Sequence, residues 1–294
     1  MVRFVAFSAL LLGLAVCGSA RANEPNNDIS EVARQLNNPV GNVWNLVVQN
    51  NFSLNKGDIS DSQRGKWVTT LQPVMPVPLT EKWNWINRPV IPIVDAPIPQ
   101  LDGSFDRETG LGDIAYMGLL TPAQPKGFLW GVGPTLLFPS ATPDELGTEK
   151  WSAGPAAVGL VLNKKFMLGA LVQQWFSYAG DDDRNDVNLL NLQYFAWWFL
   201  PNQWQVGMGS PVIVADFEAD GGDVWTVPVS LGVGKTFKIG KMPFQISLET
   251  SYAVVHPNTF GQRWNFRLQL KPVIPALVKQ PIFGGVQADF AWVS

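Results

Sequence analysis

The clearest structural signal in the chain is WNFRLQL at residues 264–270, where apolar and polar residues alternate without a break. Side chains alternate across a β-strand, so the apolar residues share one face and the polar residues share the other. Ranges 244–252 and 225–234 follow the same pattern, with aromatic residues near the strand ends. This pattern predicts strands of a transmembrane β-barrel, which turn apolar side chains toward lipid and polar ones toward a wet lumen.

The rest of the chain supports an all-β fold: a closed, antiparallel, up-and-down β-barrel of about twelve strands over residues 41–272. Long, acidic connections alternate with short ones. The long connections are 55–64, 95–109, 139–150, 180–186 and 216–222, and the short ones are 78–81, 121–126, 163–164, 201–202 and 238–242. This parity predicts short periplasmic turns and longer extracellular loops. Prolines inside the predicted strands count against the assignment, because each removes a ladder hydrogen bond.

The beginning of the chain has the features of a signal peptide. Arg3 precedes an apolar run that is too short to span a bilayer, and small residues at Ala20 and Ala22 fit a cleavage site. We therefore expect residues 1–22 to be removed, while cleavage with lipidation at Cys17 is the alternative. Cys17 is the only cysteine, so the mature chain is expected to have no disulfide.

Two segments lie outside the predicted barrel. Residues 23–40 form a periplasmic N-terminal segment, in which 29–37 is either a short amphipathic helix or part of a disordered leader. Residues 273–294 form a C-terminal extension that could be an extra strand, a plug or a flexible end. The sequence does not choose between these alternatives.

Composition limits the classes of partner. The chain has 21 Lys and Arg against 24 Asp and Glu, so it has no basic surplus for nucleic acid. With 13 Trp, 17 Phe and few charges, the expected partners are outer-membrane lipid, the barrel-assembly machinery during biogenesis, and a small-molecule solute of unknown identity. Neither a cofactor nor a metal is expected. The glycines near Gly131 lack the Lys-Ser/Thr of a phosphate loop, and the chain has a single histidine.

Two groups of polar residues are candidates for a functional site. The lumen-lining candidates are Asp113, Glu249, Asn265, Arg267 and Gln269. They could set charge selectivity or simply fill the lumen. The loop candidates for cation binding are Asp181, Asp182, Asp183 and Asp186. Dense carboxylates suit a hard cation such as calcium, but the spacing lacks the glycine and distal glutamate of a helix–loop–helix site. A solvated loop is the alternative.

Several motifs together resemble the outer-membrane family named for the MetA pathway of phenol degradation. They are QLNNPV (35–40), QNNF (49–52), GLGDI (110–114), WGVGP (130–134), EKWSAGP (149–155) and AGDDDR (179–184). The resemblance covers roughly residues 32–271. It implies an outer-membrane barrel without assigned catalytic residues, and suggests uptake of small hydrophobic compounds by association with aromatic degradation.

Three functions follow as hypotheses. The first is a bacterial outer-membrane channel that passes small hydrophobic or aromatic molecules by passive diffusion through a lumen lined by polar strand faces. The second is a non-transporting structural or surface-binding barrel, which a filled lumen would favour. The third is a lipid hydrolase that uses His256 and a serine. No motif assembles the base, nucleophile and orienting group that this chemistry needs, so we expect no enzyme activity.

Overall fold

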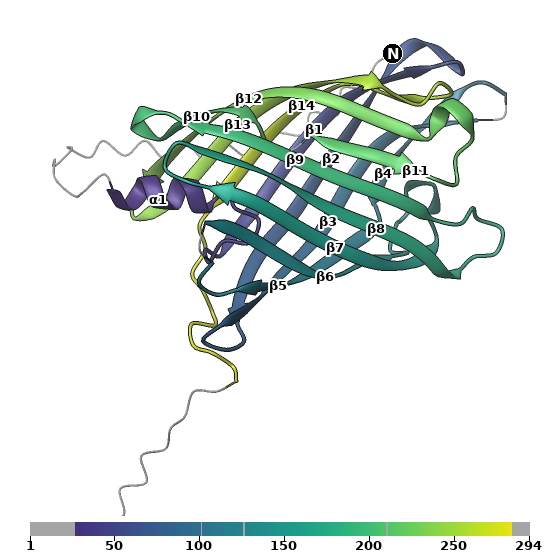
Figure 1. Ribbon diagram of the computed structural model, residues 1–294. Coiled ribbons are helices and arrows are strands. Elements are labelled where there is room, and N and C mark those ends of the chain that lie inside the picture. The colour runs from purple at the N-terminus through teal and green to yellow at the C-terminus, as the bar shows by residue number, and fades with distance from the viewer. Residues whose placement is uncertain (1–26, 101, 126, 210, 284–294) are drawn as a thin grey trace, which may run out of the picture.

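The computed structural model describes residues 27–283 apart from positions 101, 126 and 210. The predicted signal peptide and its cleavage site therefore lie outside the described residues. Figure 1 shows one barrel of tilted strands with a short helix at one end. This helix, α1 (Asn27–Gln35), overlaps the helix expected over residues 29–37. None of the described helices has the length and apolarity needed to cross a bilayer.

The barrel wall is built from β segments that pair in one sheet. In chain order they are β1 (Asn45–Gly57), β2 (Ser60–Pro78), β3 (Trp83–Pro99), β4 (Phe105–Leu111), β5 (Ile114–Pro122), β6 (Phe128–Phe138), β7 (Lys150–Leu162), β8 (Phe166–Gly180), β9 (Asn188–Phe199), β10 (Trp204–Met208), β11 (Val212–Asp216), β12 (Trp225–Ile239), β13 (Met242–Val255) and β14 (Gly261–Pro272). Short 3-10 turns η1 (Asp144–Leu146), η2 (Pro201–Gln203) and η3 (Gly221–Asp223) lie in the connections.

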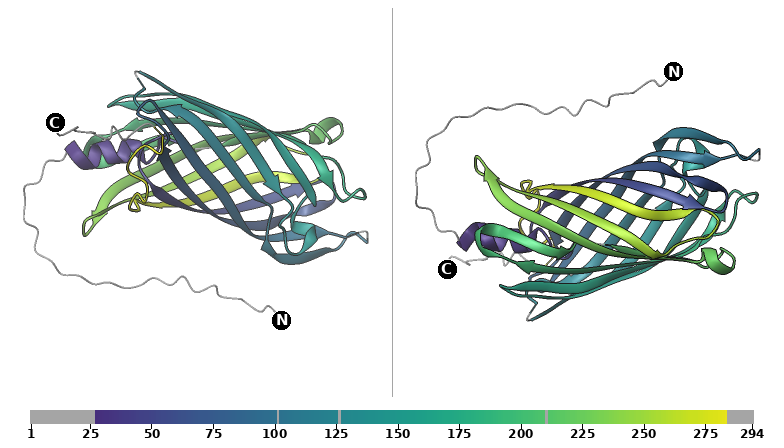
Figure 2. Two further views of the ribbon diagram at one scale, coloured as in Figure 1. Left: turned by 90° about the horizontal axis from the view of Figure 1, so that it is seen from below. Right: turned by 90° about the horizontal axis from the view of Figure 1, so that it is seen from above.

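Two of the barrel strands are interrupted. Segments β4 and β5 both pair with β3, and β10 and β11 both lie between β9 and β12. Each pair counts as one strand, so the barrel is closed, antiparallel and twelve-stranded, as the sequence predicts. Strand β14 closes it by pairing with β1 (Figure 2).

Two of the predicted extracellular loops are wrong in detail. Residues 55–64 and 95–109 belong mainly to strands, because β1 pairs with β2 as far as Gly57↔Ser60 and β3 pairs with β4 as far as Pro99↔Phe105. The extension at 55–64 is largely polar and the one at 95–109 contains Pro97 and Pro99, so the alternation that marks a membrane strand disappears although the ladder continues. The fold therefore projects two hairpins beyond the barrel at the end opposite α1 (Figure 1).

The predicted alternation is confirmed on the neighbouring strands β13 and β14. Leu248 and Phe266 are 56% and 46% exposed, whereas Glu249 and Asn265 are 8% and 4% exposed. Glu249 pairs with Arg267 in the ladder, so these polar side chains share the inner face. The outer face presents apolar side chains, which is the arrangement that lipid requires of a barrel.

Several prolines within the strands lie at gaps in the ladders, whereas Pro76 and Pro92 occupy paired positions of the β2–β3 ladder. Between β2 and β3 the pairing stops at Leu71↔Ile91 and resumes at Met75↔Asn87, and Pro73 and Pro89 lie in that gap. Pro134 and Pro155 lie in similar gaps of the β5–β6 and β7–β8 ladders. A proline lacks the N–H that a ladder uses, so placing it where pairing is already broken limits the cost.

Candidate functional site

The inner surface of the barrel has two unlike sides. The inward side chains of β5–β9 are largely apolar, and we call this surface the apolar wall. Its members are Met117, Leu119, Ala156, Val158, Leu160, Met167, Leu171, Phe195 and Trp197. They are buried and form one cluster. The expectation of a lumen lined by polar faces is therefore wrong for this side. Strands such as β7 are apolar on both faces, so alternation alone could not show which residues point inward.

The opposite side of the lumen is formed by β12, β13, β14 and β1, and we call it the polar wall. Its inward side chains are Thr236, Gln245, Ser247, Glu249, Ser251, Asn265, Arg267, Gln269, Gln49, Asn51 and Ser53. Many are bonded to one another: Gln269 Nε2 donates to Gln49 Oε1 at 2.7 Å, and Gln245 Nε2 donates to Thr236 Oγ1 at 3.0 Å. Buried polar groups need such partners, because an unpaired one costs free energy.

Glu249 and Arg267 form an ion pair at the centre of the polar wall. Arg267 Nη1 lies 3.2 Å from Glu249 Oε1, and Arg267 Nε donates to Asn51 Oδ1 at 2.9 Å. The other Glu249 oxygen accepts a hydrogen bond from the backbone N–H of Gly209. Gly209 lies between β10 and β11, where the strand carries one extra residue relative to β9. The carboxylate therefore satisfies a backbone donor that this β-bulge leaves without a ladder partner.

Two further cations, Arg88 on β3 and Lys271 on β14, lie in the same part of the lumen. The charges of Arg88, Arg267 and Glu249 all act on the Lys271 ammonium. Arg88 Nη2 donates to Gln72 Oε1 at 3.0 Å, while its Nε is buried and has no acceptor among the described residues. Lys271 Nζ donates to the Leu36 carbonyl oxygen at 3.3 Å. Within the part of the chain that the structure describes, neither cation forms an ion pair.

The segment that follows α1 enters the barrel at its periplasmic end. Leu36, Val40 and Trp44 are buried, and Val40 belongs to the same cluster as the apolar wall. The amides of Asn37 and Gln205 bond reciprocally at 2.7 and 3.1 Å. We call residues 36–44 the N-terminal plug, because they lie at the lumen mouth and Asn37 bonds there to Gln205 of β10.

The plug bonds to the barrel on the far side as well. Trp44 Nε1 donates to the Pro76 carbonyl oxygen at 2.7 Å, and Asn84 Nδ2 donates to Asn42 Oδ1 at 2.9 Å. The tail after β14 also contacts the plug at this end, since Ile274 N donates to the Trp44 carbonyl oxygen at 2.9 Å. The described part of the tail up to 283 forms neither a helix nor a strand.

A cleft opens at each end of the barrel. The periplasmic cleft is about 340 Å³ and lies beside the plug, where Val40, Leu129 and Leu162 bring the apolar cluster to its lining. The extracellular cleft is about 380 Å³ and is lined by Val187 and Leu189 together with charged loop residues. Apolar surface is therefore present at both ends of the lumen. Thr135, Gln173 and Gln193 form a polar band between them.

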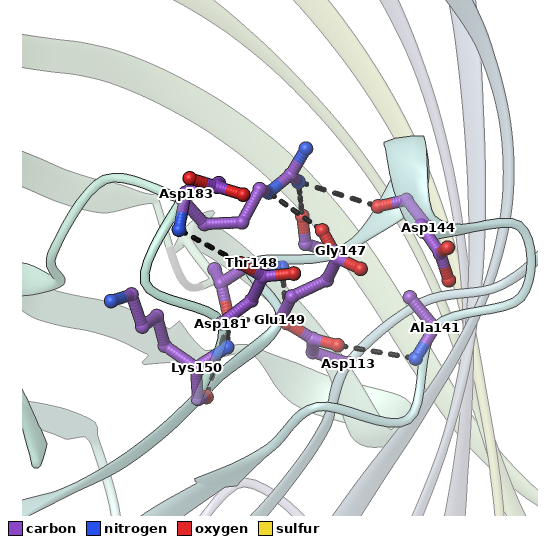
Figure 3. Close-up of polar contacts among 10 residues, drawn as sticks. Asp113, Ala141, Asp144, Gly147, Thr148, Glu149, Lys150, Asp181 and Asp183 are labelled. Atoms are coloured by element: carbon purple, nitrogen blue, oxygen red, sulfur yellow. Dashed lines mark hydrogen bonds and ion pairs between the residues drawn. The ribbon is translucent and has the colours of Figure 1, made fainter. Parts of the chain in front are cut away.

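Asp113 was predicted to line the lumen, and the structure places it in the connection between β4 and β5. Its Oδ2 accepts hydrogen bonds from Thr148 N and Thr148 Oγ1, both at 2.7 Å (Figure 3). Its Oδ1 accepts hydrogen bonds from the backbone N–H groups of Ser140 and Ala141 at 3.1 and 3.2 Å. These donors come from one extracellular loop, so the Asp113 carboxylate holds the loop in place over the barrel end.

The acidic loop is held by local bonds. Asp181 Oδ1 accepts from the backbone N–H of Asp183 at 2.8 Å, and Arg184 pairs with Glu149 at 2.9 Å (Figure 3). Asp186 accepts from Ser177 Oγ, and this bond together with nearby Lys150 lowers the pKa of the Asp186 carboxyl. The described residues contain no group of three or more acidic, histidine or cysteine side chains placed to hold a metal ion. Asp182 belongs to the same loop and is exposed.

His256, the residue on which a hydrolase would depend, has other partners. Its Nδ1 lies 2.8 Å from the Pro257 carbonyl oxygen, and its Nε2 contacts Arg263 Nη1. Among the described residues, no serine is bonded to the ring. This arrangement lacks the base–nucleophile contact that hydrolysis requires.

Sequence reasoning predicted that Glu249, Asn265, Arg267 and Gln269 line the lumen, and the structure places all four inward on the polar wall. It missed Arg88 and Lys271. Lys271 continues the alternation of Asn265, Arg267 and Gln269 by one step, so extending the pattern past Leu270 would have found it. Arg88 directly precedes Pro89, where the alternation of polar and apolar residues is interrupted.

No protein family model matches the sequence, and no curated protein matches it. Solved structures do match. A Pseudomonas aeruginosa FadL homologue matches with a TM-score of 0.44 and 10% identity over 80% of this chain and 90% of that chain. The COG4313 outer membrane channel from Pseudomonas putida F1 matches with a TM-score of 0.56 and 16% identity, covering 79% of this chain and 94% of that chain. This chain therefore shares its fold with an outer membrane channel.

Proposed function

We propose that this protein is an outer-membrane channel that passes small hydrophobic molecules by passive diffusion. The observation that carries the proposal is the apolar wall inside the barrel. A channel for hydrophilic solutes keeps its lumen polar. When these packed apolar side chains move apart, the surface they expose favours an apolar solute over water, by roughly 25 cal/mol per Å² of apolar area kept from water.

The two clefts give the proposed path its ends. A solute entering through the extracellular cleft meets Leu189, and one leaving beside the plug passes Leu129 and Leu162. The plug and the packed side chains of the periplasmic half must move apart to let it through. The fold shared with an outer membrane channel and the motifs that resemble the phenol-degradation family support the same proposal.

Accumulation of a labelled alkylbenzene in intact cells would test the function. Cells with the protein in their outer membrane are compared with cells that lack it. Wild type should accelerate accumulation, and Leu171→Gln should reduce the gain because it places an amide in the apolar wall. Leu168→Gln is the matched control, since Leu168 is 57% exposed on the outer face of the same strand. Equal accumulation with and without the protein would reject the proposal.

The second candidate is a non-transporting barrel. The observation that favours it is the plug, which fills the periplasmic mouth and bonds to both sides of it. Pure protein folded into liposomes separates the two functions. A channel gives solute flux or conductance, and a structural barrel gives neither.

A further inference from the structure

We infer that the lumen contains a site for the carboxylate of an amphiphilic solute, formed by Arg88 and Lys271 beside the apolar cluster. The inference rests on the proposed function and narrows its substrate class to molecules with an apolar body and one anionic group. The solute would hold its carboxylate against the two cations and lay its apolar body along the apolar wall.

The charges in this part of the lumen are unbalanced. Two cations, Arg88 and Arg267, and a single carboxylate, Glu249, act on the Lys271 ammonium. Glu249 is already 3.2 Å from Arg267 and also accepts from Gly209. Among the described residues, the oxygens that accept hydrogen bonds from Arg88 and Lys271 belong to Gln72 and Leu36 and are neutral. A cation away from water without a counter-charge destabilises the protein, so an incoming anion removes a cost that the protein already carries.

Arg88 and Lys271 also carry more hydrogen-bond donors than their bonds use. A guanidinium has five N–H donors and an ammonium has three. Arg88 uses Nη2 on Gln72, while its Nε–H is buried without an acceptor among the described residues. Lys271 uses one donor on the Leu36 carbonyl oxygen. A carboxylate accepts on two oxygens and pairs well with a guanidinium, so it fits this excess better than a neutral polar group.

The position of the two cations fits an amphiphile. Lys271 pairs with Gln245 in the β13–β14 ladder, and Arg88 reaches across to Gln72 on β2. Between these strands the inward side chains include Gln72 and also Val47 and Val74, which are buried members of the apolar cluster. The cations therefore lie where the polar wall meets the apolar cluster. One solute can touch both surfaces there.

The test compares three solutes that share a para-butylphenyl body: the carboxylate para-butylbenzoic acid, the alcohol para-butylbenzyl alcohol and the amine para-butylbenzylamine. Binding to the purified protein in lipid nanodiscs is measured by calorimetry, with empty nanodiscs as the blank. Wild type should bind the acid at least about tenfold more tightly than the alcohol, and the amine most weakly. Equal affinity for acid and alcohol, or preference for the amine, would overturn the inference.

Variants locate the site. Arg88→Gln and Lys271→Gln should each weaken binding of the acid by about tenfold and leave the alcohol unchanged. Arg88→Lys keeps the charge and should keep most of the preference, which guards against a variant that folds poorly. Lys235→Gln removes a cation near the Asn202 turn and should change nothing. Unchanged binding of the acid in both glutamine variants would refute the assignment to these residues.

The outcome also separates this inference from the function on which it rests. If the alcohol binds and crosses the membrane but the acid gains no advantage, only the anion site is wrong. If neither solute binds and neither is accumulated by cells, both the channel and the site are wrong.

Discussion

The apolar wall and the polar wall are parts of one sheet, built from strands of similar length, yet they are stabilised in different ways. The apolar wall is a packed cluster completed by Val40 of the plug. The polar wall is a network of amides, hydroxyls and one ion pair. The comparison teaches that lipid constrains only the outer face of a barrel. The inner face is free to be a hydrophobic core on one side and a polar surface on the other.

The largest effect on the free energy of unfolding is expected from a cavity in the apolar wall. Trp197 is 3% exposed, and Trp197→Ala should lower the free energy of unfolding by about 3–5 kcal/mol because it leaves a large cavity. Its neighbour Trp198 is 53% exposed on the outer face, so Trp198→Ala should cost much less. Denaturant unfolding in lipid vesicles measures both. Equal losses would contradict a packed inner cluster.

On the polar wall, the strongest single change is expected at the ion pair. Glu249→Gln leaves Arg267 inside the lumen without its carboxylate and should cost about 3 kcal/mol. The same unfolding measurement applies. Gln269→Leu is the comparison on the same wall, and it should cost about 1 kcal/mol because it removes one neutral hydrogen bond to Gln49. A loss for Glu249→Gln no greater than that for Gln269→Leu would show that the ion pair contributes little to the free energy of unfolding.

The plug contacts both walls, and a substitution in it should have a smaller effect than those in the walls. Asn37→Ala removes the reciprocal amide bonds to Gln205 and should weaken docking by about 1–2 kcal/mol. Faster hydrogen exchange over residues 36–44 and faster liposome swelling would follow. Ser62→Ala, in an exposed extracellular position, is the control. Unchanged exchange in Asn37→Ala would mean that these bonds do not hold the plug.

The smallest effect is expected outside both walls, at the acidic loop. The pKa of Asp186 is lowered by Ser177 and Lys150. A lowered carboxyl pKa means that its stabilising contribution is present above the unfolded pKa, near 3.9, and is lost as pH falls through the folded value. The Asp186 titration followed by NMR should move upward in Ser177→Ala. No movement would show that this bond does not act on the carboxyl.

Much of the outer face was predictable from the sequence, because lipid imposes strict alternation on residues such as Phe266 and Leu268. The polar wall was predictable for the same reason, since Arg267 and Gln269 lie between them. The apolar wall was not, because the sequence around Val158 and Leu160 is apolar on both strand faces. The same cluster includes Val40, which lies more than a hundred residues before Val158 in the sequence.

The role of Asp113 could not be predicted either. Its partners Ser140, Ala141 and Thr148 come from a loop whose conformation leaves no periodic trace in the sequence. The sequence around a lone carboxylate at a strand end is the same whether the side chain faces the lumen or bonds to a loop.

Photo-crosslinking with a diazirine-labelled alkylbenzene tests the central claim most directly, namely that hydrophobic solute occupies the apolar wall. The protein in lipid vesicles is labelled, and the modified residues are found by mass spectrometry with and without excess unlabelled alkylbenzene. Our account predicts adducts on inward residues such as Leu119, Leu171 and Phe195 that the competitor removes. Adducts confined to outward residues such as Leu168 and Phe176 would contradict it.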